Sequence, residues 1–399
     1  MKLQAQVVIA SDKVDPPASA TALDDLSGAV SGDRMIAALA LLEAFLKTDA
    51  ARGEALLNRF SERVPPDLVR VTREAVNEGV GDKDRETLRR HLGWFADLAR
   101  GPGGSDPPRE PEIRSRALFV LGLMGVALLG VSMAFLAGLV LLILHLRNVQ
   151  AGTTRHHYEP MPSLRSVLLE CFALYLAIMS GSALLSPWLG SWAGITGYGL
   201  AVILPLTWPA LRGVAWRDFR KAVGLHRGRG WAREIAAGVV GYLGVLAIAS
   251  IGIALTFIMT LVAGWVEGLG AAGDPSLVGS GAPGPNTHPV VGWIYDGNIW
   301  VRLACLGLAA GFAPVFEELF FRGALQGYFR GRFRFLASAL LTGLIFAALH
   351  PQGFFAIPAL AGIGVGFSLL REWRDSLVAP MVAHAINNGS LVLMLWWLL

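Results

Sequence analysis

Three ionisable residues lie together in a part of the chain that is otherwise apolar. The stretch 316–323, with the sequence FEELFFRG, contains Glu317, Glu318 and Arg322. Glu318 and Arg322 are four residues apart, a spacing at which helical side chains can form an ion pair. Glu317 lies on a different face of the same helix and has no such local partner. An unpaired carboxylate in apolar surroundings is suited to general-base activation of water.

Two later apolar stretches supply complementary side chains. The sequence FAALH places Phe346 and His350 one helical turn apart, and HAINN does the same for His384 and Asn388. Residues four apart share one face of a helix, so His384 and Asn388 can reach one substrate. Histidine can bind a metal or donate a hydrogen bond, and asparagine can donate to a developing oxyanion.

In this order, the stretches EELFFR, FAALH and HAINN resemble three motifs of one family. The motifs are Glu-Glu-x-x-x-Arg, Phe-x-x-x-His and His-x-x-x-Asn, and the family is the CAAX protease and bacteriocin-processing family of intramembrane endopeptidases, which includes the CAAX prenyl endopeptidases. The resemblance covers roughly residues 300–398. It implies hydrolysis of a peptide bond of a membrane-associated protein or peptide.

The resemblance also implies roles for the matching residues. Glu317 with His350 would activate the attacking water, and His384 and Asn388 would stabilise the tetrahedral oxyanion. The pair of Glu318 with Arg322 would hold the helix geometry. Members of the family are often described as metalloproteases, and three of these residues, Glu317, His350 and His384, could ligate zinc. The zinc signature HExxH is absent, so we expect no obligatory cofactor and keep zinc as the alternative.

The composition indicates a membrane protein. Of 399 residues, 54% are hydrophobic and 16% are charged, well below the charged share of an ordinary soluble domain. The formal charge of +4 is modest and the arginines lie in short loops, which argues against a nucleic-acid partner. We therefore expect an all-α fold, a polytopic transmembrane helical bundle of about 7–8 spans with an N-terminal soluble helical domain. The bilayer would be its immediate environment.

The apolar segments and the charged loops predict the organisation of the chain. We expect apolar segments at roughly 117–146, 166–187, 192–211, 235–266, 300–326, 335–350, 354–370 and 377–398. Basic loops at 212–233 and 330–334, and a third with Arg371 and Arg374, would face the cytoplasm, and the loop 267–299 the other side. This predicts N-terminal spans over 113–299 and a catalytic membrane core over 300–399, in a multi-pass protein of a bacterial inner membrane.

The sequence of residues 1–112 predicts a separate soluble helical domain that ends in a Gly/Pro-rich linker. After a polar start, its helices are expected in 33–47, 65–80 and 82–100. Nothing in it carries recognisable chemistry, so its function and its partner are not predicted. Eight simple spans would place this domain on the outer side of the membrane, but no signal peptide that could carry it there is visible. We therefore expect that one early apolar segment does not simply cross the membrane.

Two other functions fit parts of the pattern. A non-catalytic membrane scaffold of the same fold, serving immunity or assembly, would not need an unpaired buried carboxylate. A transporter using Glu170 and Glu317 would be expected to show an internal repeat, and none is visible. Glu170 is better explained as a polar contact between helices, and Gly362 with Gly366 as a close helix packing site.

Overall fold

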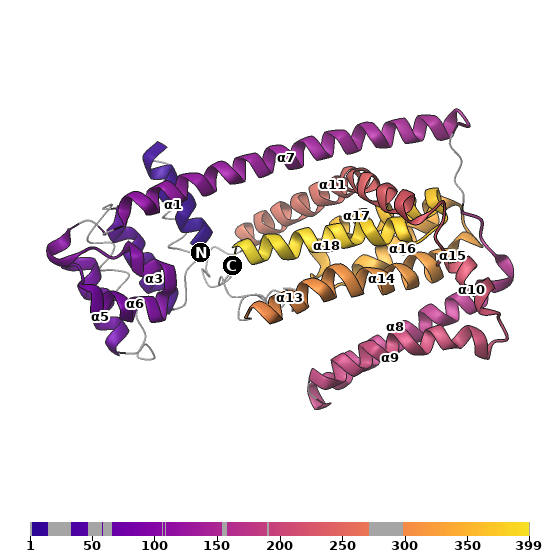
Figure 1. The fold of residues 1–399 in the computed structure, drawn as a ribbon, viewed down its shortest axis with the longest axis horizontal. Helices are drawn as coiled ribbons and strands as arrows, with labels where there is room; N and C mark the ends of the chain where they lie inside the picture. Colours follow the sequence, from indigo (N-terminus) through magenta and orange to yellow (C-terminus); the bar gives the residue numbers. More distant parts are fainter. Residues whose placement is uncertain are drawn as a thin grey trace. The chain divides into compact units, whose positions relative to one another are not determined.

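The structure of the chain is a computed structural model, and every regular element that it describes is a helix (Figure 1). It describes residues 2–14, 33–46, 58, 66–105, 107, 109–153, 158–189, 191–270 and 298–398. The expected all-α class is thereby confirmed. Contacts divide the chain into two units, Met1–Gly130 and Val131–Ala272 with Asn286–Trp397.

The first unit is a small helical domain with its own apolar core. Leu39, Leu42, Leu68 and Leu88 are fully buried in one cluster. Its helices are α1 (Lys2–Val14), α3 (Asp33–Leu46), α5 (Pro66–Asn77), α6 (Asp82–Leu92) and the 3-10 turn η1 (Gly93–Leu98). α1 forms where the sequence suggested only a polar start, because Val8 and Ile9 find buried places in the core. Tertiary burial thus overrides weak local amphipathicity.

The second unit contains most of the long apolar helices. Six helical runs are long and apolar enough to cross a membrane: Glu110–Gln150, Pro162–Leu185, Trp231–Ala263, Ile299–Arg330, Phe354–Arg374 and Val378–Trp396. Thr196–Leu211 and Phe335–Ala348 are shorter apolar helices. The helices concerned are α7 (Glu110–Gln150), α8 (Arg165–Leu189), α9 (Ser191–Leu211), α11 (Trp231–Gly270), α16 (Phe335–Ala348), α17 (Ile357–Arg374) and α18 (Val378–Leu398). Each of the eight predicted apolar segments therefore lies largely within a helix.

The run that carries the two glutamates is a helix interrupted by two π-helical stretches. In order it consists of α13 (Ile299–Gly307), η5 (Leu308–Phe312), α14 (Ala313–Glu318), η6 (Leu319–Leu325) and α15 (Gln326–Arg330), where η5 and η6 are π-helical. η5 ends just before Pro314, whose missing N–H removes one bond of the regular ladder. π-helical turns of this kind are frequent at functional sites, since they re-aim side chains and free carbonyl groups. The glutamates lie on the short α-helical piece between the two.

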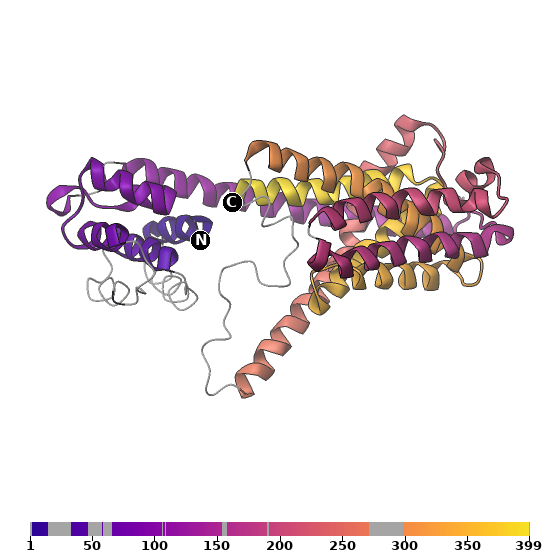
Figure 2. The ribbon, with the colours of Figure 1, turned by 90° about the horizontal axis from the view of Figure 1, so that it is seen from below.

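Close packing fixes α17 against its neighbours. A Cβ added to Gly362 would lie 3.0 Å from the Cα of Ala249, and one at Gly366 would lie 2.8 Å from a side-chain carbon of Val245. The predicted small-residue contact is therefore present, between α17 and α11. α18 runs beside the interrupted helix 299–330, called the broken helix from here on, in both views (Figures 1 and 2). The three motifs are thus carried by neighbouring helices of one bundle.

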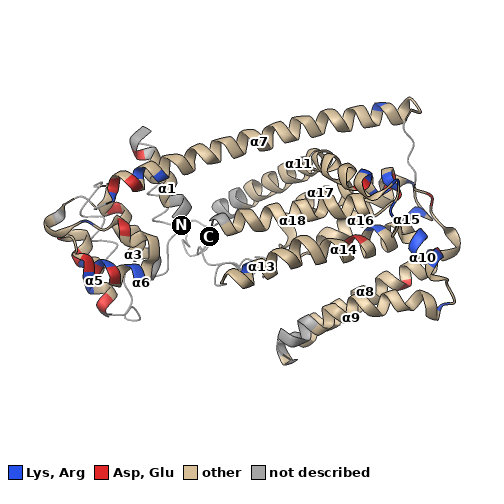
Figure 3. Cartoon of the chain, viewed as in Figure 1, with Lys and Arg blue, Asp and Glu red and all other residues tan. Residues whose placement is uncertain are grey.

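Lys and Arg gather at one end of the second unit, the end at which α10 (Trp216–Val223) and α15 lie (Figure 3). The third of the predicted basic loops does not belong to this exposed set. Arg371 is fully buried and Arg374 is 9% exposed, and both are engaged in ion pairs. Counting arginines cannot distinguish an exposed loop charge from a buried pair. The predicted loop 267–299 lies almost wholly outside the described residues.

Candidate functional site

A fully buried ion pair lies at the centre of the site. Arg322 Nη1 donates to Glu318 Oε1 over 2.9 Å, as the spacing predicted, and neither side chain is exposed. Arg322 Nη2 also donates to the carbonyl of Gly364 on α17, over 3.2 Å. The guanidinium carbon lies 4.5 Å from the ring centre of Phe346, on α16. The pair therefore ties the broken helix to two neighbouring helices as well as holding its own turn.

His384 on α18 is held from two sides. Its Nδ1 lies 2.8 Å from Glu318 Oε1, and its ring stacks on Phe367 with centroids 4.8 Å apart and an angle of 27°. A carboxylate oxygen only accepts, so the Nδ1 atom of His384 carries a proton. Its Nε2 atom faces the second glutamate, 3.8 Å from Glu317 Oε2. Glu318 thus has a function that the sequence did not suggest: it orients a predicted catalytic histidine.

Glu317 differs from Glu318 in its surroundings. Its side chain is 20% exposed, compared with 0% for Glu318. Its Oε2 atom is nevertheless buried and makes no hydrogen bond to any group in the structure. A buried carboxylate oxygen without a partner costs free energy unless water or a ligand satisfies it. Glu318 also has one buried oxygen without a hydrogen bond, Oε2, but its Oε1 binds Arg322 and His384. The expected division, with Glu318 paired to arginine and Glu317 not, agrees with this geometry.

His350 lies just beyond the end of α16 and shares a neighbour with His384. Its Nδ1 is 2.7 Å from the carbonyl oxygen of Phe346, which can only accept, so this nitrogen carries a proton. The Nε2 atom of a neutral His350 is then an acceptor. The Phe346 ring centre lies 4.3 Å from that of His350 and 5.9 Å from that of His384. The two histidines therefore flank one aromatic ring.

Asn388 is the end of a directed hydrogen-bond chain. The hydroxyl of Tyr242 on α11 donates to Asn387 Oδ1 over 3.3 Å, and Asn387 Nδ2 donates to Asn388 Oδ1 over 3.1 Å. Asn388 Nδ2 donates to the carbonyl of Ala309, in η5, over 3.0 Å. Because a carbonyl only accepts, this contact fixes the orientation of both amides. One hydrogen of the Asn388 amide is left for another acceptor.

The predicted metal ligands do not form a metal-binding set. Throughout the part of the chain that the structure describes, no group of three His, Cys, Asp or Glu residues is arranged to hold a metal ion. Glu317 and His384 approach each other, and the Nδ1 atoms of His384 and His350 are held by Glu318 and by a backbone carbonyl. These bonds leave the Nε2 atoms of both histidines available, as in histidines that ligate a metal, so zinc stays an alternative to a metal-free reaction.

The convergence of His384 with the glutamates has a structural cause. Counted from Arg374, His384 is only ten residues along the chain, which suggests a shallow position. The start of α18 is itself buried, however: Leu377 and Ala379 are 0% exposed. The backbone N–H of Leu377 donates to the carbonyl of Gly224, which follows α10, so that segment covers the start of α18. This cover places His384 deeper in the fold than counting indicates.

Several residues of the site were not predicted. Asn387 and Tyr242 orient Asn388, Phe367 stacks on His384, and Gly364 supplies a carbonyl to Arg322. Asn387 is part of the stretch HAINN, but only Asn388 lies four residues after His384, so the spacing argument did not select Asn387. The other three lie on helices α11 and α17, whose proximity no local pattern reveals.

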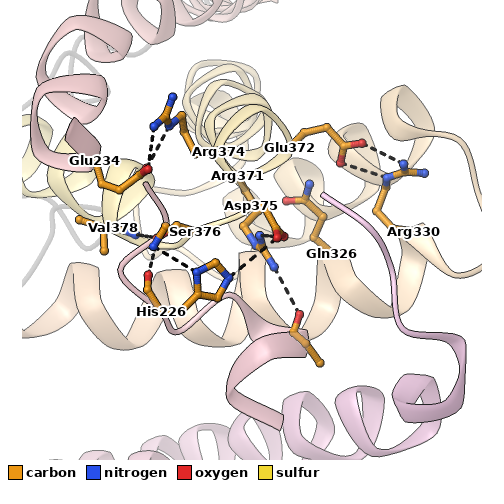
Figure 4. A network of polar contacts seen from close by, with 12 residues as sticks. His226, Glu234, Gln326, Arg330, Arg371, Glu372, Arg374, Asp375, Ser376 and Val378 are labelled. Carbon is orange, nitrogen blue, oxygen red and sulfur yellow. Dashed lines mark hydrogen bonds and ion pairs between the residues drawn. The ribbon is translucent and has the colours of Figure 1, made fainter. Parts of the chain in front are cut away.

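Other buried ion pairs lie outside the site, where they connect helix ends (Figure 4). Arg374 makes two bonds to Glu234 of α11, of 2.7 and 3.0 Å, and Arg330 makes two to Glu372, of 2.8 and 3.0 Å. Glu170, set aside as a catalytic candidate, accepts a hydrogen bond of 2.8 Å from the indole of Trp208 and so joins α8 to α9. These carboxylates hydrogen-bond to arginine or tryptophan side chains, whereas in the described part of the chain Glu317 approaches only His384, at 3.8 Å.

Comparison with known proteins agrees with the motifs. Residues 298–390 match a family model described as type II CAAX prenyl endopeptidase Rce1-like. The chain is 33% identical over 86 residues to the membrane-embedded CAAX protease MroQ of Staphylococcus aureus (strain USA300). This alignment covers 20% of the present chain. The matched part spans about 34% of that relative's length. No solved structure matches the chain. The region 298–390, with its three motifs in order on adjoining helices, therefore belongs to the CAAX protease and bacteriocin-processing family.

Proposed function

We propose that the chain is an intramembrane endopeptidase that hydrolyses a peptide bond of a membrane-associated protein or peptide. One observation carries the proposal: Glu317 presents a buried carboxylate oxygen without a hydrogen bond, 3.8 Å from His384 Nε2, beside Glu318, whose Oε1 binds Arg322 and His384. At 3.8 Å the two atoms do not form a direct hydrogen bond, so both are available to a water molecule or to a substrate atom. The relative from Staphylococcus aureus is named a membrane-embedded protease, which is consistent with this activity.

The charges of the site favour one shared proton. The charges of Glu318 and Arg322 cancel, so the net charge of the site depends on Glu317 and His384. With Glu317 ionised and His384 neutral, the buried cluster has an uncompensated negative charge, which low-polarity surroundings disfavour. A single additional proton, on either Glu317 or His384 Nε2, makes the cluster neutral. This allows the proton to move between the two groups during a reaction without net charge entering the apolar interior.

The reaction follows from these positions. Glu317, ionised, takes a proton from water as the water oxygen bonds to the scissile carbonyl carbon, and the acceptor Nε2 of His350 helps to orient that water. The oxyanion is met by the remaining amide hydrogen of Asn388 and by the Nε2 proton of His384 in its charged form. Glu318 stabilises that charged form. The C–N bond then breaks, and the proton held by Glu317 passes to the leaving amine.

The proposed setting is the bacterial inner membrane, with the basic end of the second unit toward the cytoplasm.

The test compares protein amino-termini in cells producing the wild type with those in cells producing Glu317→Gln, which preserves the shape of the side chain and removes its charge. Glu170→Gln is the matched control, since it removes another carboxylate of an apolar helix. We expect a new amino-terminus in wild-type and control cells that is absent with Glu317→Gln at equal membrane abundance. Identical amino-termini in all three would support the non-catalytic scaffold.

A further inference from the structure

A second polar site lies at the basic end of the second unit, on α10. This helix joins the segment after α9 to the loop before α11, and its apolar side chains Phe219, Ala222 and Val223 are buried. They belong to the same core cluster as Phe320 and Phe321 of the broken helix. A Cβ on Gly323 would lie 2.9 Å from Val223, so α10 packs directly on η6.

The opposite face of α10 is cationic. Arg217, Arg220 and Lys221 are exposed and lie at i, i+3 and i+4, and so on one face of the helix. None of the three forms an ion pair with an acidic residue in the described part of the chain, Asp218 of the same helix included. Like charges at these spacings repel each other unless an anion lies between them.

The three cations line a pocket. Its volume is about 320 Å³, and Leu225, His226 and Asp375 complete its wall. Asp375 does not cancel the positive charge, because Arg371 Nη1 donates to it over 2.9 Å and contributes a compensating charge from beneath (Figure 4). The pocket therefore carries an excess of three positive charges, two of them on guanidinium groups whose planar geometry matches phosphate oxygens.

The flanking residues indicate the depth of this pocket in a bilayer. Trp216 at the start of α10 and Trp231 at the start of α11 are 50% and 62% exposed. Exposed tryptophans next to apolar spans are typical of the membrane–water boundary. We propose that the α10 pocket binds a phosphate group and that its source is the headgroup of an anionic phospholipid. The bound group would hold α10 against the helix that carries Glu317.

The experiment measures the binding of defined phosphate compounds to the full-length protein in neutral detergent. The probes are phosphatidylglycerol, phosphatidylcholine and inorganic phosphate, and native mass spectrometry counts the bound molecules at increasing concentration. The pocket variant is Arg217→Gln/Arg220→Gln/Lys221→Gln. The control variant is Arg227→Gln/Arg233→Gln/Arg334→Gln, which removes three exposed charges from the same unit outside the pocket.

We expect one phosphatidylglycerol to bind the wild type and the control variant with similar affinity. Because each cation near a lipid surface contributes about a fivefold gain, the pocket variant should lose on the order of a hundredfold. Saturable binding of inorganic phosphate that is lost in the same variant would retain the phosphate site and reassign its source to solution. Equal binding by wild type and pocket variant would overturn the proposal, as would an equal loss in the control variant. Lys221→Gln alone, expected to lose about fivefold, serves if the triple variant does not fold.

Discussion

The buried pair of Glu318 with Arg322 leads to a prediction in which stability and activity separate. In Glu318→Gln the charge of the acceptor disappears, while Arg322 stays fully buried and keeps only neutral acceptors, among them the carbonyl of Gly364. Two bonds to the carboxylate, from Arg322 at 2.9 Å and from His384 at 2.8 Å, become bonds to a neutral amide.

The magnitude follows from these contacts. A hydrogen bond to a charged group contributes about 1.5–3 kcal/mol and one to a neutral group about 0.5–1.5 kcal/mol, so weakening two of them costs about 2–3 kcal/mol. Leaving the buried charge of Arg322 without its partner brings the expected loss to about 3–5 kcal/mol. We expect the second change in Glu318→Gln/Arg322→Met to restore most of this stability, because it removes the orphaned charge. Activity should not return, since the neutral amide cannot stabilise a charged His384.

The assay combines two measurements on protein in detergent. Thermal unfolding gives the change in stability, and cleavage of the substrate identified by its new amino-terminus gives the rate per folded molecule. Glu234→Gln is the control, because it orphans a comparably buried arginine, Arg374, outside the site. It should lower stability but leave the rate per folded molecule unchanged. A loss of less than about 1 kcal/mol in Glu318→Gln, or recovery of the rate in the double variant, would refute the reasoning.

Three further predictions concern the support of the site. Gly224→Ala should destabilise the fold by more than about 2 kcal/mol, because the φ of Gly224 is +82° and the added Cβ would lie 2.6 Å from a buried guanidinium. The control Gly213→Ala, where φ is +73° and the added Cβ meets open space, should cost about 1 kcal/mol. Equal unfolding temperatures of the two variants would contradict this prediction. Burial lowers the pKa of His226, against an opposing effect of a nearby carboxylate, so the unfolded chain binds the proton more readily. Thermal melts of wild type and His226→Gln should therefore show wild-type stability falling, relative to the variant, as the pH decreases through about 6.5, and parallel pH profiles would exclude the effect. Tyr242→Phe removes the bond that orients Asn387 and should reduce kcat about fivefold with KM unchanged, as initial-rate measurements can establish; a change in KM alone would argue against a positioning role.

The sequence by itself determined the helical membrane class, the approximate apolar segments and the residues whose side chains could take part in catalysis. Composition and run length suffice for the first two, because a lipid-exposed segment must satisfy its backbone internally and be apolar throughout. The pairing of Glu318 with Arg322 was equally predictable, since it depends only on helical spacing. The type and order of the three motifs, from Glu317 to Asn388, also indicated the family, and the match of residues 298–390 to a family model confirmed it.

Tertiary structure decided what these residues contact. Nothing local shows that Glu318 also holds His384, because the two are 66 residues apart on different helices. The same is true of Tyr242, which acts on the site through Asn387 from α11. Apolar helices also give no sign of their partners, because the face turned to lipid and the face turned to protein have similar composition. Burial of Arg371 and Arg374 was missed for a related reason: an ion pair between distant segments has no periodicity that a sequence can display.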